Sequence, residues 1–373
     1  MLKILHCADI HLDTPFSLGN LQIAEQRRAE LRSSFVNMMM YAKDNAVNIL
    51  LICGDLFDSN EPTPATLEMV LREFAAVPNM QIVITPGNHD PYGADSVYQK
   101  HQFPPNAHIF TGEYAERLDI DRYNLSIYGN AWHGKSYKNP LKSLTVLDER
   151  RINVICAHGD LYSSSSETIT TADIRATGAD YVALGHIHAG TEPIREGKTY
   201  YAYSGSLEGR DFGEIGVRGA LMLVLDKQDG VLGFRSNFVR FSRRRYEILK
   251  VDIGGINDDS QLFEHVQSAI YEQKHGEDTL LRVILTGEAN PALKINTSVL
   301  RSAGERLFYV EIVDKTIPQI DYAELENDST IRGEFYELLL PLFRQAEGDE
   351  KIVADMALKY GLAALAGNDI VDF

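Results

Sequence analysis

Cysteine, tryptophan and long apolar runs are all scarce in this chain of 373 residues. Its three cysteines, Cys7, Cys53 and Cys156, form an odd set without a CxxC spacing, which argues against a disulfide framework and against a thiolate metal site. No run approaches the ~18 apolar residues of a membrane span. The chain opens on a strand-like segment rather than a signal peptide. We therefore expect a cytoplasmic protein with reduced, buried cysteines.

Basic residues are also in deficit, with 36 Lys and Arg against 53 Asp and Glu, a net charge of −17. Proteins that bind nucleic acid usually present a basic surface, so the charge argues against such a substrate. The deficit is concentrated in residues 320–373, which hold 12 acidic and 4 basic side chains. A local basic run either contacts phosphates or is a solvated linker. This run comprises Arg240, Arg243, Arg244 and Arg245.

Five short apolar runs each end in residues suited to binding metal ions. The runs are rich in β-branched and aliphatic residues, which is typical of buried strands. Ligands of open α/β sheets bind beyond the carboxyl ends of the strands, so one edge of one sheet could gather all these side chains. The polar clusters are Asp9 and His11; Asp55 and Asp58; Asn88, His89 and Asp90; His158; and His186 and His188.

Oxygen and imidazole ligands without thiolate suit Mn²⁺, Fe²⁺ or Zn²⁺. The candidates are too many for one ion and fit two ions about 3.5–4 Å apart with a bridging carboxylate, an arrangement that promotes phosphoryl displacement. The candidate ligands are Asp9, His11, Asp55, Asn88, His158, His186 and His188. His89 is then free to act as a general acid, and Asp58 could orient it through its other ring nitrogen.

These residues resemble the signature of calcineurin-like metallophosphoesterases: Asp-x-His, Gly-Asp-x-x-Asp, Gly-Asn-His-Asp, His-Gly and Gly-His-x-His. Protein phosphatases of that superfamily usually have GNHE and an Arg-Gly after the second motif, whereas this chain has GNHD and Ser59-Asn60. The opening LKILHCADIHLD and the segment YAYSGSLEGRDFGEIGVRG at 201–219 are similar to SbcD-type DNA repair exonucleases, and within that group to the YhaO branch. The resemblance covers residues 1 to about 240.

The resemblance implies a role for each matching position. Asp9, His11, Asp55 and His188 would hold the first ion, and Asn88, His158 and His186 would complete the second, with Asp55 shared. His89 would be the general acid, paired with Asp58, while Asp90 has no chemical role assigned beyond fixing its loop. The resemblance further implies a Mn²⁺-dependent nuclease that cleaves DNA, has an SMC-like coiled-coil ATPase as its partner, and forms a homodimer through helices near 21–46 and 65–77.

Strand-like and helical segments alternate over residues 1–240, which predicts a layered α/β sandwich. The resemblance implies that this is the metallophosphoesterase sandwich of four layers, α/β/β/α. Thr63 and Pro64 predict the start of one helix, as N-cap and N1. The hydroxyl-rich stretch 163–173 predicts a surface loop near His158. Residues 241–318 predict a small α/β module. The resemblance implies that it is a capping domain that guides DNA, and the alternative is a packing or dimerisation module.

Residues 319–373 predict an acidic helical extension, in which Pro341 should kink or end a helix. The extension either packs on its own domain or, as the resemblance implies, is an arm that docks to the ATPase. Two alternatives to the nuclease remain open. One is a phosphodiesterase or phosphatase acting on small molecules, which fits the acidic charge better. The other is a metal-stabilised regulator of the ATPase without catalysis.

Overall fold

The computed structural model describes residues 1–134, 138–142, 144–161, 168–290, 292–320 and 322–365. Residues 163–167 of the expected surface loop lie outside the described residues. The chain divides into two compact units, Met1–Tyr246 and Glu247–Phe373, which are described separately. The finer division at residues 240 and 318 stays a proposal.

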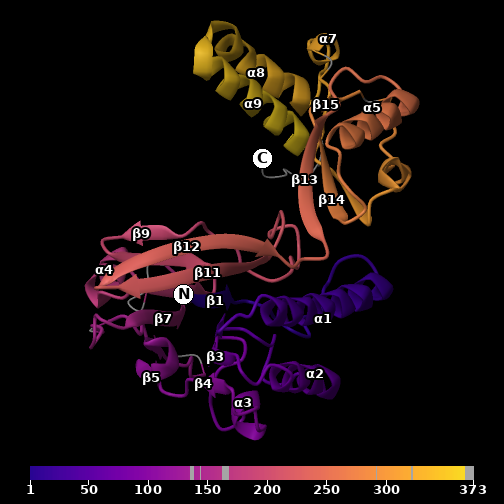
Figure 1. Ribbon diagram of the computed structural model, residues 1–373. Helices are drawn as coiled ribbons and strands as arrows, with labels where there is room; N and C mark the ends of the chain where they lie inside the picture. Colours follow the sequence, from indigo (N-terminus) through magenta and orange to yellow (C-terminus); the bar gives the residue numbers. More distant parts are fainter. Residues whose placement is uncertain (135–137, 143, 162–167, 291, 321, 366–373) are drawn as a thin grey trace. The chain divides into compact units, whose positions relative to one another are not determined.

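Two six-stranded sheets form the centre of the first unit (Figure 1). The first has the order β12-β11-β1-β2-β3-β4, and the second β5-β6-β7-β8-β10-β9. The strands of the first sheet are β12 (Val231–Arg240), β11 (Gly219–Gln228), β1 (Leu2–Cys7), β2 (Ile49–Cys53), β3 (Gln81–Thr85) and β4 (Ala107–Ile109). Those of the second are β5 (Glu116–Ile120), β6 (Leu125–Gly129), β7 (Ile152–His158), β8 (Tyr181–Gly185), β10 (Thr199–Tyr203) and β9 (Ile194–Glu196).

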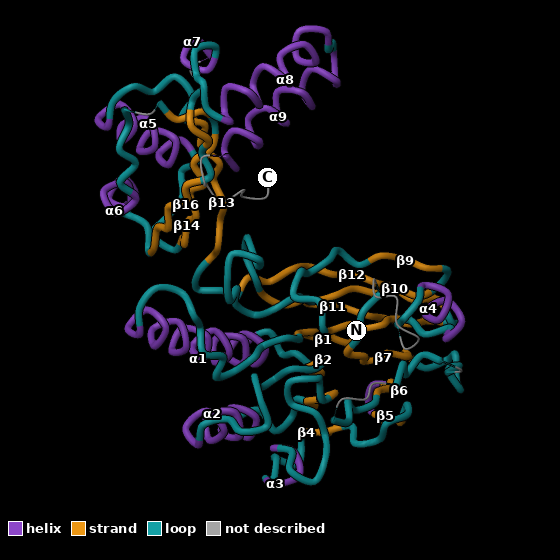
Figure 2. The backbone as a smooth tube through the Cα atoms, turned by 180° about the vertical axis from the view of Figure 1, so that it is seen from behind, coloured by secondary structure: helices purple, strands orange, loops and turns teal. Residues whose placement is uncertain are grey.

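Helices cover the outer faces of both sheets, which confirms the predicted four-layer sandwich. Helices α1 (Leu21–Asp44), α2 (Pro64–Ala75) and α3 (Val97–Lys100) share an apolar core with the first sheet. A second core fills the space between the sheets, and a third joins α4 (Thr171–Thr177) to the second sheet. Figure 2 shows α1 and α2 on one side of the two sheets and α4 on the other. As predicted, Thr63 caps α2, accepting from the Thr66 amide, and Pro64 is its first residue.

The expectation that one sheet carries all five ligand clusters is wrong. β1, β2 and β3 are parallel neighbours in the first sheet, whereas β7 and β8 are parallel neighbours in the second. The two sheets approach each other closely at the carboxyl ends of β2 and β8, where Gly185 lies against the main chain of β2. A Cβ at this glycine would come within 1.8 Å of the Cys53 carbonyl oxygen. The carboxyl ends of two packed sheets, rather than one edge, therefore gather the side chains.

The second unit contains a sheet of order β13-β14-β16, packed on α5 and short helical turns around its own apolar core. Its elements are β13 (Arg245–Asp252), α5 (Asp259–Glu272), β14 (Thr279–Thr286), β15 (Glu288–Ala289), α6 (Thr297–Leu300), β16 (Tyr309–Asp314) and β17 (Ile317–Pro318). Helices α7 (Tyr322–Leu325), α8 (Ile331–Gln345) and α9 (Gly348–Leu365) follow. α8 continues for four residues beyond Pro341, so this proline does not end the helix. None of the described helices is long and apolar enough to cross a membrane.

Candidate metal centre

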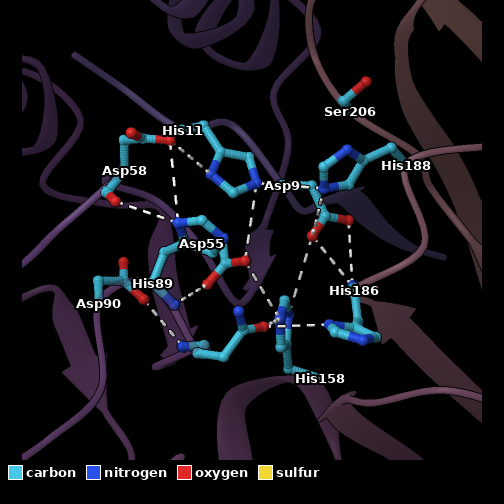
Figure 3. Close-up of polar contacts among 12 residues, drawn as sticks. Asp9, His11, Asp55, Asp58, His89, Asp90, His158, His186, His188 and Ser206 are labelled. Atoms are coloured by element: carbon cyan, nitrogen blue, oxygen red, sulfur yellow. Dashed lines mark hydrogen bonds and ion pairs between the residues drawn. The ribbon is translucent and has the colours of Figure 1, made fainter. Parts of the chain in front are cut away.

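The structure brings all seven candidate ligands together at the carboxyl ends of five strands. Figure 3 shows Asp9, His11, Asp55, His158, His186 and His188 gathered in one place. Asp9 and His11 follow β1, Asp55 follows β2 and Asn88 follows β3, while His158 is the last residue of β7, and His186 and His188 follow β8. These strands are buried along their length. Each polar side chain is therefore fixed at the point where a rigid strand stops.

The first group of side chains consists of Asp9, His11 and His188, whose ligand atoms lie within 4.8 Å of one another. Nε2 of His11 lies 3.2 Å from Nε2 of His188 and 3.6 Å from Oδ2 of Asp55. Oδ1 of Asp9 lies 3.9 Å from Nε2 of His188. These four side chains are the ones expected to hold the first ion.

The second group is built around the side-chain oxygen of Asn88. This Oδ1 lies 2.9 Å from Nε2 of His158 and 3.1 Å from Nδ1 of His186. Oδ2 of Asp55 lies 3.3 Å from Nε2 of His158, in addition to its approach to His11. Asp55 thus contacts both groups, as a carboxylate shared between two ions must.

The donor set suits divalent cations, because hydrogen bonds on the outer nitrogens aim the inner lone pairs at one another. Nδ1–H of His158 donates to the Cys53 carbonyl at 2.9 Å, and Nδ1–H of His188 donates to Oε1 of Glu214 at 2.6 Å. The two Nε2 lone pairs then face carboxylates and other imidazoles. Partners of this kind fix the tautomer of ligating histidines and increase their basicity. A cation placed among such lone pairs removes their mutual repulsion.

Protonation at the site is controlled first by burial. Burial lowers the pKa of His11 and of His186 to about 4, so both rings are neutral at physiological pH, as ligands must be. Burial raises the pKa of Asp9 to about 6. Burial alone would lower the pKa of His158, but the carboxylates of Asp55 and Asp9 outweigh it and raise this pKa to about 9. The proton on His158 occupies a position among carboxylates that a metal cation can take instead.

The backbone is strained at the same positions. Asp9 and His11 have φ of 50°, Asp55 has φ of 53° and His186 has φ of 96°. Residues with a side chain rarely adopt positive φ, and each such residue costs on the order of 1–3 kcal/mol. Strain of this kind concentrates at functional sites, where the surrounding structure holds it. Four strained residues among the candidate ligands therefore support a functional site here.

His89 and Asp58 lie beside the first group. The His89 amide donates to Oδ1 of Asp55 at 2.8 Å, and Nδ1–H of its ring donates to the Asp58 backbone carbonyl at 3.1 Å. Oδ1 of Asp58 lies 3.2 Å from Nδ1 of His11 and 3.9 Å from Nδ1 of His89. The carboxylate thus lies between two imidazoles and nearer to His11, while the main chain of Asp58 orients His89.

Asp90 holds the loop after β3 from inside. Its buried carboxylate accepts hydrogen bonds from the Gly87 amide at 2.8 Å, the Phe57 amide at 3.1 Å and the Tyr98 hydroxyl at 2.6 Å. These bonds join the loop that carries Asn88 to the loop that carries Asp58. No part of this carboxylate is left for substrate.

Sequence reasoning missed three residues at the site. Glu214 and Arg210 both contact His188, and the Trp132 ring stacks on His186 with 6.1 Å between centroids. The segment 201–219 that carries Glu214 and Arg210 drew attention only through its resemblance to exonucleases. The sequence feature that could have pointed to Glu214 and Arg210 is the group of acidic and basic residues in the second half of that segment.

The chain belongs to the calcineurin-like phosphoesterase family, whose model matches residues 2–190. Membership implies hydrolysis of phosphoesters with two divalent metal ions. The match spans all five strand ends that carry the candidate ligands. It confirms the family suggested by the sequence motifs.

Within this family, the chain is similar to three curated proteins. The uncharacterised metallophosphoesterase YhaO of Bacillus subtilis is 25% identical over 77% of this chain and 72% of its own length. The DNA double-strand break repair protein Mre11 of Methanopyrus kandleri is 27% identical over 74% of this chain and 65% of its own. The SbcD component of the nuclease SbcCD of Rhodobacter capsulatus is 26% identical over 52% of this chain and 46% of its own. Among solved structures, a dimetal phosphatase from Danio rerio is 9% identical, with 64% of this chain and 98% of that one covered and a TM-score of 0.39.

Proposed function

We propose that this protein is a Mn²⁺-dependent phosphodiesterase that cleaves DNA strands as the nuclease subunit of a complex with an SMC-like coiled-coil ATPase. The observation that carries the proposal is the convergence of seven oxygen and nitrogen ligands in two adjacent groups, both of which Asp55 contacts. The names of the Mre11 and SbcCD relatives support DNA as the substrate. Fe²⁺ and Zn²⁺ suit the same ligands.

In this proposal Asp9, His11, Asp55 and His188 hold the first ion, and Asp55, Asn88, His158 and His186 hold the second. Two such ions supply Lewis acidity to the phosphoryl oxygens and a nucleophile at neutral pH. The protein keeps the ligands in place through buried strands and through the hydrogen bonds on the outer ring nitrogens. This rigidity fixes the geometry before the substrate arrives.

His89 is the proposed general acid. Its side chain is 40% exposed, so it can reach a bound substrate, and the bond from Nδ1 to the Asp58 carbonyl leaves Nε2 available. Protonated at Nε2, the ring gives this proton to the departing sugar oxygen. The carboxylate of Asp58 lies beside the ring, with Oδ1 3.9 Å from Nδ1.

The test is degradation of end-labelled single- and double-stranded DNA with Mn²⁺, Mg²⁺ or EDTA, for the wild type and His89→Ala. We expect Mn²⁺-dependent degradation that falls on the order of 100-fold in the variant, since general acid catalysis contributes 10²–10⁴-fold. Elemental analysis should find the same metal content in both proteins. A variant that loses metal would contradict the separation of roles, and an unchanged rate would remove His89 from the mechanism.

The acidic composition favours a second candidate, a phosphodiesterase or phosphatase for small molecules. Hydrolysis of a chromogenic diester that excess DNA does not inhibit would support it. A third candidate is a regulator of the ATPase without catalysis. Such a regulator would have no need of an accessible general acid such as His89. A tight complex with the ATPase and no metal-dependent hydrolysis would support that candidate.

Helices α8 and α9 are the proposed docking arm for the ATPase. They pair with each other, yet several of their apolar side chains remain exposed. Leu338 is 75% exposed, Val353 65% and Leu342 62%. Apolar side chains at helical spacing suit a coiled-coil partner. Homodimerisation through α1 and α2, and guidance of DNA by the α/β module of the second unit, complete the proposal.

A further inference from the structure

The loop between β10 and β11, residues 204–218, places a buried carboxylate and an arginine beside His188. Glu214 is 7% exposed and accepts from Nδ1–H of His188 at 2.6 Å. It also accepts from the Arg210 amide at 3.1 Å, from Nε of Arg210 at 3.0 Å and from the Ser206 hydroxyl at 3.3 Å. Glu214 therefore anchors both the histidine and the arginine.

The two ends of the Arg210 side chain differ in how firmly they are held. Its Nε and main chain are fixed by Glu214, and its carbonyl accepts from the Tyr246 hydroxyl at 2.9 Å. Its terminal nitrogens face the site: Nη2 lies 2.8 Å from Nδ1 of His188, and Nη1 lies 3.8 Å from Oδ1 of Asp58. The side chain is 24% exposed. The guanidinium is thus anchored at Nε, while its terminal nitrogens face His188 and Asp58.

Arg210 and Glu214 compete for the same atom of His188. If Nδ1 carries a proton, it donates to Glu214 and cannot accept from Nη2; if it lacks one, it accepts from Nη2 and Nε2 carries the proton. Nε2 is the nitrogen that faces Asp9 and His11, so a ligating His188 must keep its proton on Nδ1. Nη2 then has no acceptor on the imidazole. Both terminal nitrogens of Arg210 become available to a ligand that lies between His188 and Asp58.

A planar guanidinium presents two terminal donors in a geometry that matches the non-bridging oxygens of a phosphate. The loop that follows Asp58 supplies no cation, since Ser59 and Asn60 come next. In a protein with a net charge of −17, a cationic side chain would add to the positive charge that the two metal ions would supply to a bound phosphate. Arg210 provides one at the mouth of the site, next to the proposed general acid pair.

We propose that Arg210 is a catalytic residue that binds the non-bridging oxygens of the scissile phosphodiester, held in register by Glu214. The inference rests on the proposed phosphodiesterase function and adds a protein cation to it. It predicts that phosphate binding and turnover depend on the guanidinium, while metal binding does not.

The test compares Mn²⁺-loaded wild type with Arg210→Ala and Arg210→Lys. Elemental analysis gives the metal content, calorimetry gives the affinity for inorganic phosphate, and bis(4-nitrophenyl) phosphate gives kcat and KM. We expect equal metal content in all three proteins. We expect Arg210→Ala to weaken phosphate binding and to lower kcat/KM on the order of 10–100-fold, the scale of a hydrogen bond to a charged group. Arg210→Lys should restore part of both, and added guanidinium ion should restore part of the turnover of Arg210→Ala.

Arg195→Ala is the matched control, because Arg195 is an exposed arginine of the same unit on β9. It should bind phosphate and hydrolyse the diester as the wild type does. Wild-type phosphate affinity in metal-loaded Arg210→Ala would overturn the inference, and so would loss of metal in that variant, which would make Arg210 a support for His188. Wild type that cleaves the chromogenic diester but not DNA would instead remove DNA as substrate and leave the role of Arg210 intact. Phosphate calorimetry decides the role of Arg210 even if neither substrate is cleaved.

Discussion

Gly54 lies directly against the ring of His158. Its φ is +92°, and a Cβ built on it would lie 1.9 Å from Nδ1 of His158. Glycine is required here both by the backbone conformation and by the lack of space. The position lets His158 bond to the Cys53 carbonyl while its Nε2 faces the other ligands.

The variant Gly54→Ala should therefore displace His158 and weaken Mn²⁺ binding by at least about tenfold, a loss of about 1.4 kcal/mol. The strained backbone should also lower the free energy of unfolding by about 1–3 kcal/mol. Calorimetric titration with Mn²⁺ and urea unfolding in EDTA measure the two effects. Gly93→Ala is the matched control, because a Cβ there meets no atom within 4 Å. Equal effects of the two substitutions would contradict the role of Gly54.

His6 makes stability depend on pH independently of the metal ligands. Burial lowers its pKa to about 3, while Nε2–H donates to the Leu184 carbonyl and Nδ1 accepts from the Tyr181 hydroxyl. Because the folded pKa lies below the unfolded value of 6.5, the unfolded chain binds the extra proton below pH 6.5. The contribution of neutral His6 to the free energy of unfolding is fully present above pH 6.5 and is lost as the pH falls toward 3.

Urea unfolding in EDTA between pH 7 and 4 should show the free energy of unfolding falling with decreasing pH. His6 should contribute a slope of up to about 1.4 kcal/mol per pH unit. His6→Gln should remove that part of the slope, whereas substitution of the exposed His101 by Gln should leave it unchanged. A slope that His6→Gln does not alter would assign the pH dependence to other groups.

Site residues that belong to a sequence motif could be predicted. Site residues that reach the ligands only through the packing of loops could not. Asp9, Asn88 and His158 could be predicted because each comes at or just after the end of an apolar, strand-like run. Glu214 does not, because its partner is 26 residues away and the contact depends on how β10 and β11 place the loop. The approach of Asp58 to His11, across two strands, was hidden for the same reason.

Helix α1 is fastened to the sandwich by a buried ion-pair network. Arg27, with its side chain fully buried, bonds to Glu30 at 2.7 Å and to Glu208 at 2.9 Å. Glu30 also bonds to Arg244 at 2.7 Å, and the Arg243 amide donates to Glu208. At least Arg244 of the basic run therefore has a structural role, which favours the linker interpretation at this position.

Arg27→Leu should destabilise the protein by about 3–5 kcal/mol, because it leaves the buried Glu208 without its cation. The double variant Arg27→Leu/Glu208→Gln should be more stable than the single one, since the uncompensated charge is gone. Arg72→Ala is the control, because Arg72 is 67% exposed and its pair with Glu73 is worth less than about 1 kcal/mol. Urea unfolding measures all three, and a loss for Arg27→Leu no larger than the control would contradict this account.

The apolar patterns predicted the type of most helices and strands. They did not predict how the strands assemble into sheets. The expected helices near 21–46 and 65–77 are α1 and α2. The pattern of residues 297–307 is helical, yet this segment forms only the short helix α6 followed by a 3₁₀ turn. The assignment of five strands to two sheets depends on pairings between distant segments, which periodicity does not encode.

At the scale of the whole molecule, an acidic chain and a phosphate-binding site are compatible in this account. Divalent ions are the largest local charges of a site and dominate its potential over short distances. Much of the acidic excess falls in residues 320–373, in a different unit from the ligands. Composition therefore indicated the sign of the average surface charge but not that of the site.

The most direct test of the central claim is the number of metal ions that each chain binds. Purified apoprotein is loaded with Mn²⁺, freed of excess metal and analysed for its elemental content, together with Asp55→Asn. The account predicts two ions per chain in the wild type and fewer than one in the variant, because Asp55 contacts both groups. One ion or none in the wild type, or two in Asp55→Asn, would contradict a two-metal centre bridged by this carboxylate.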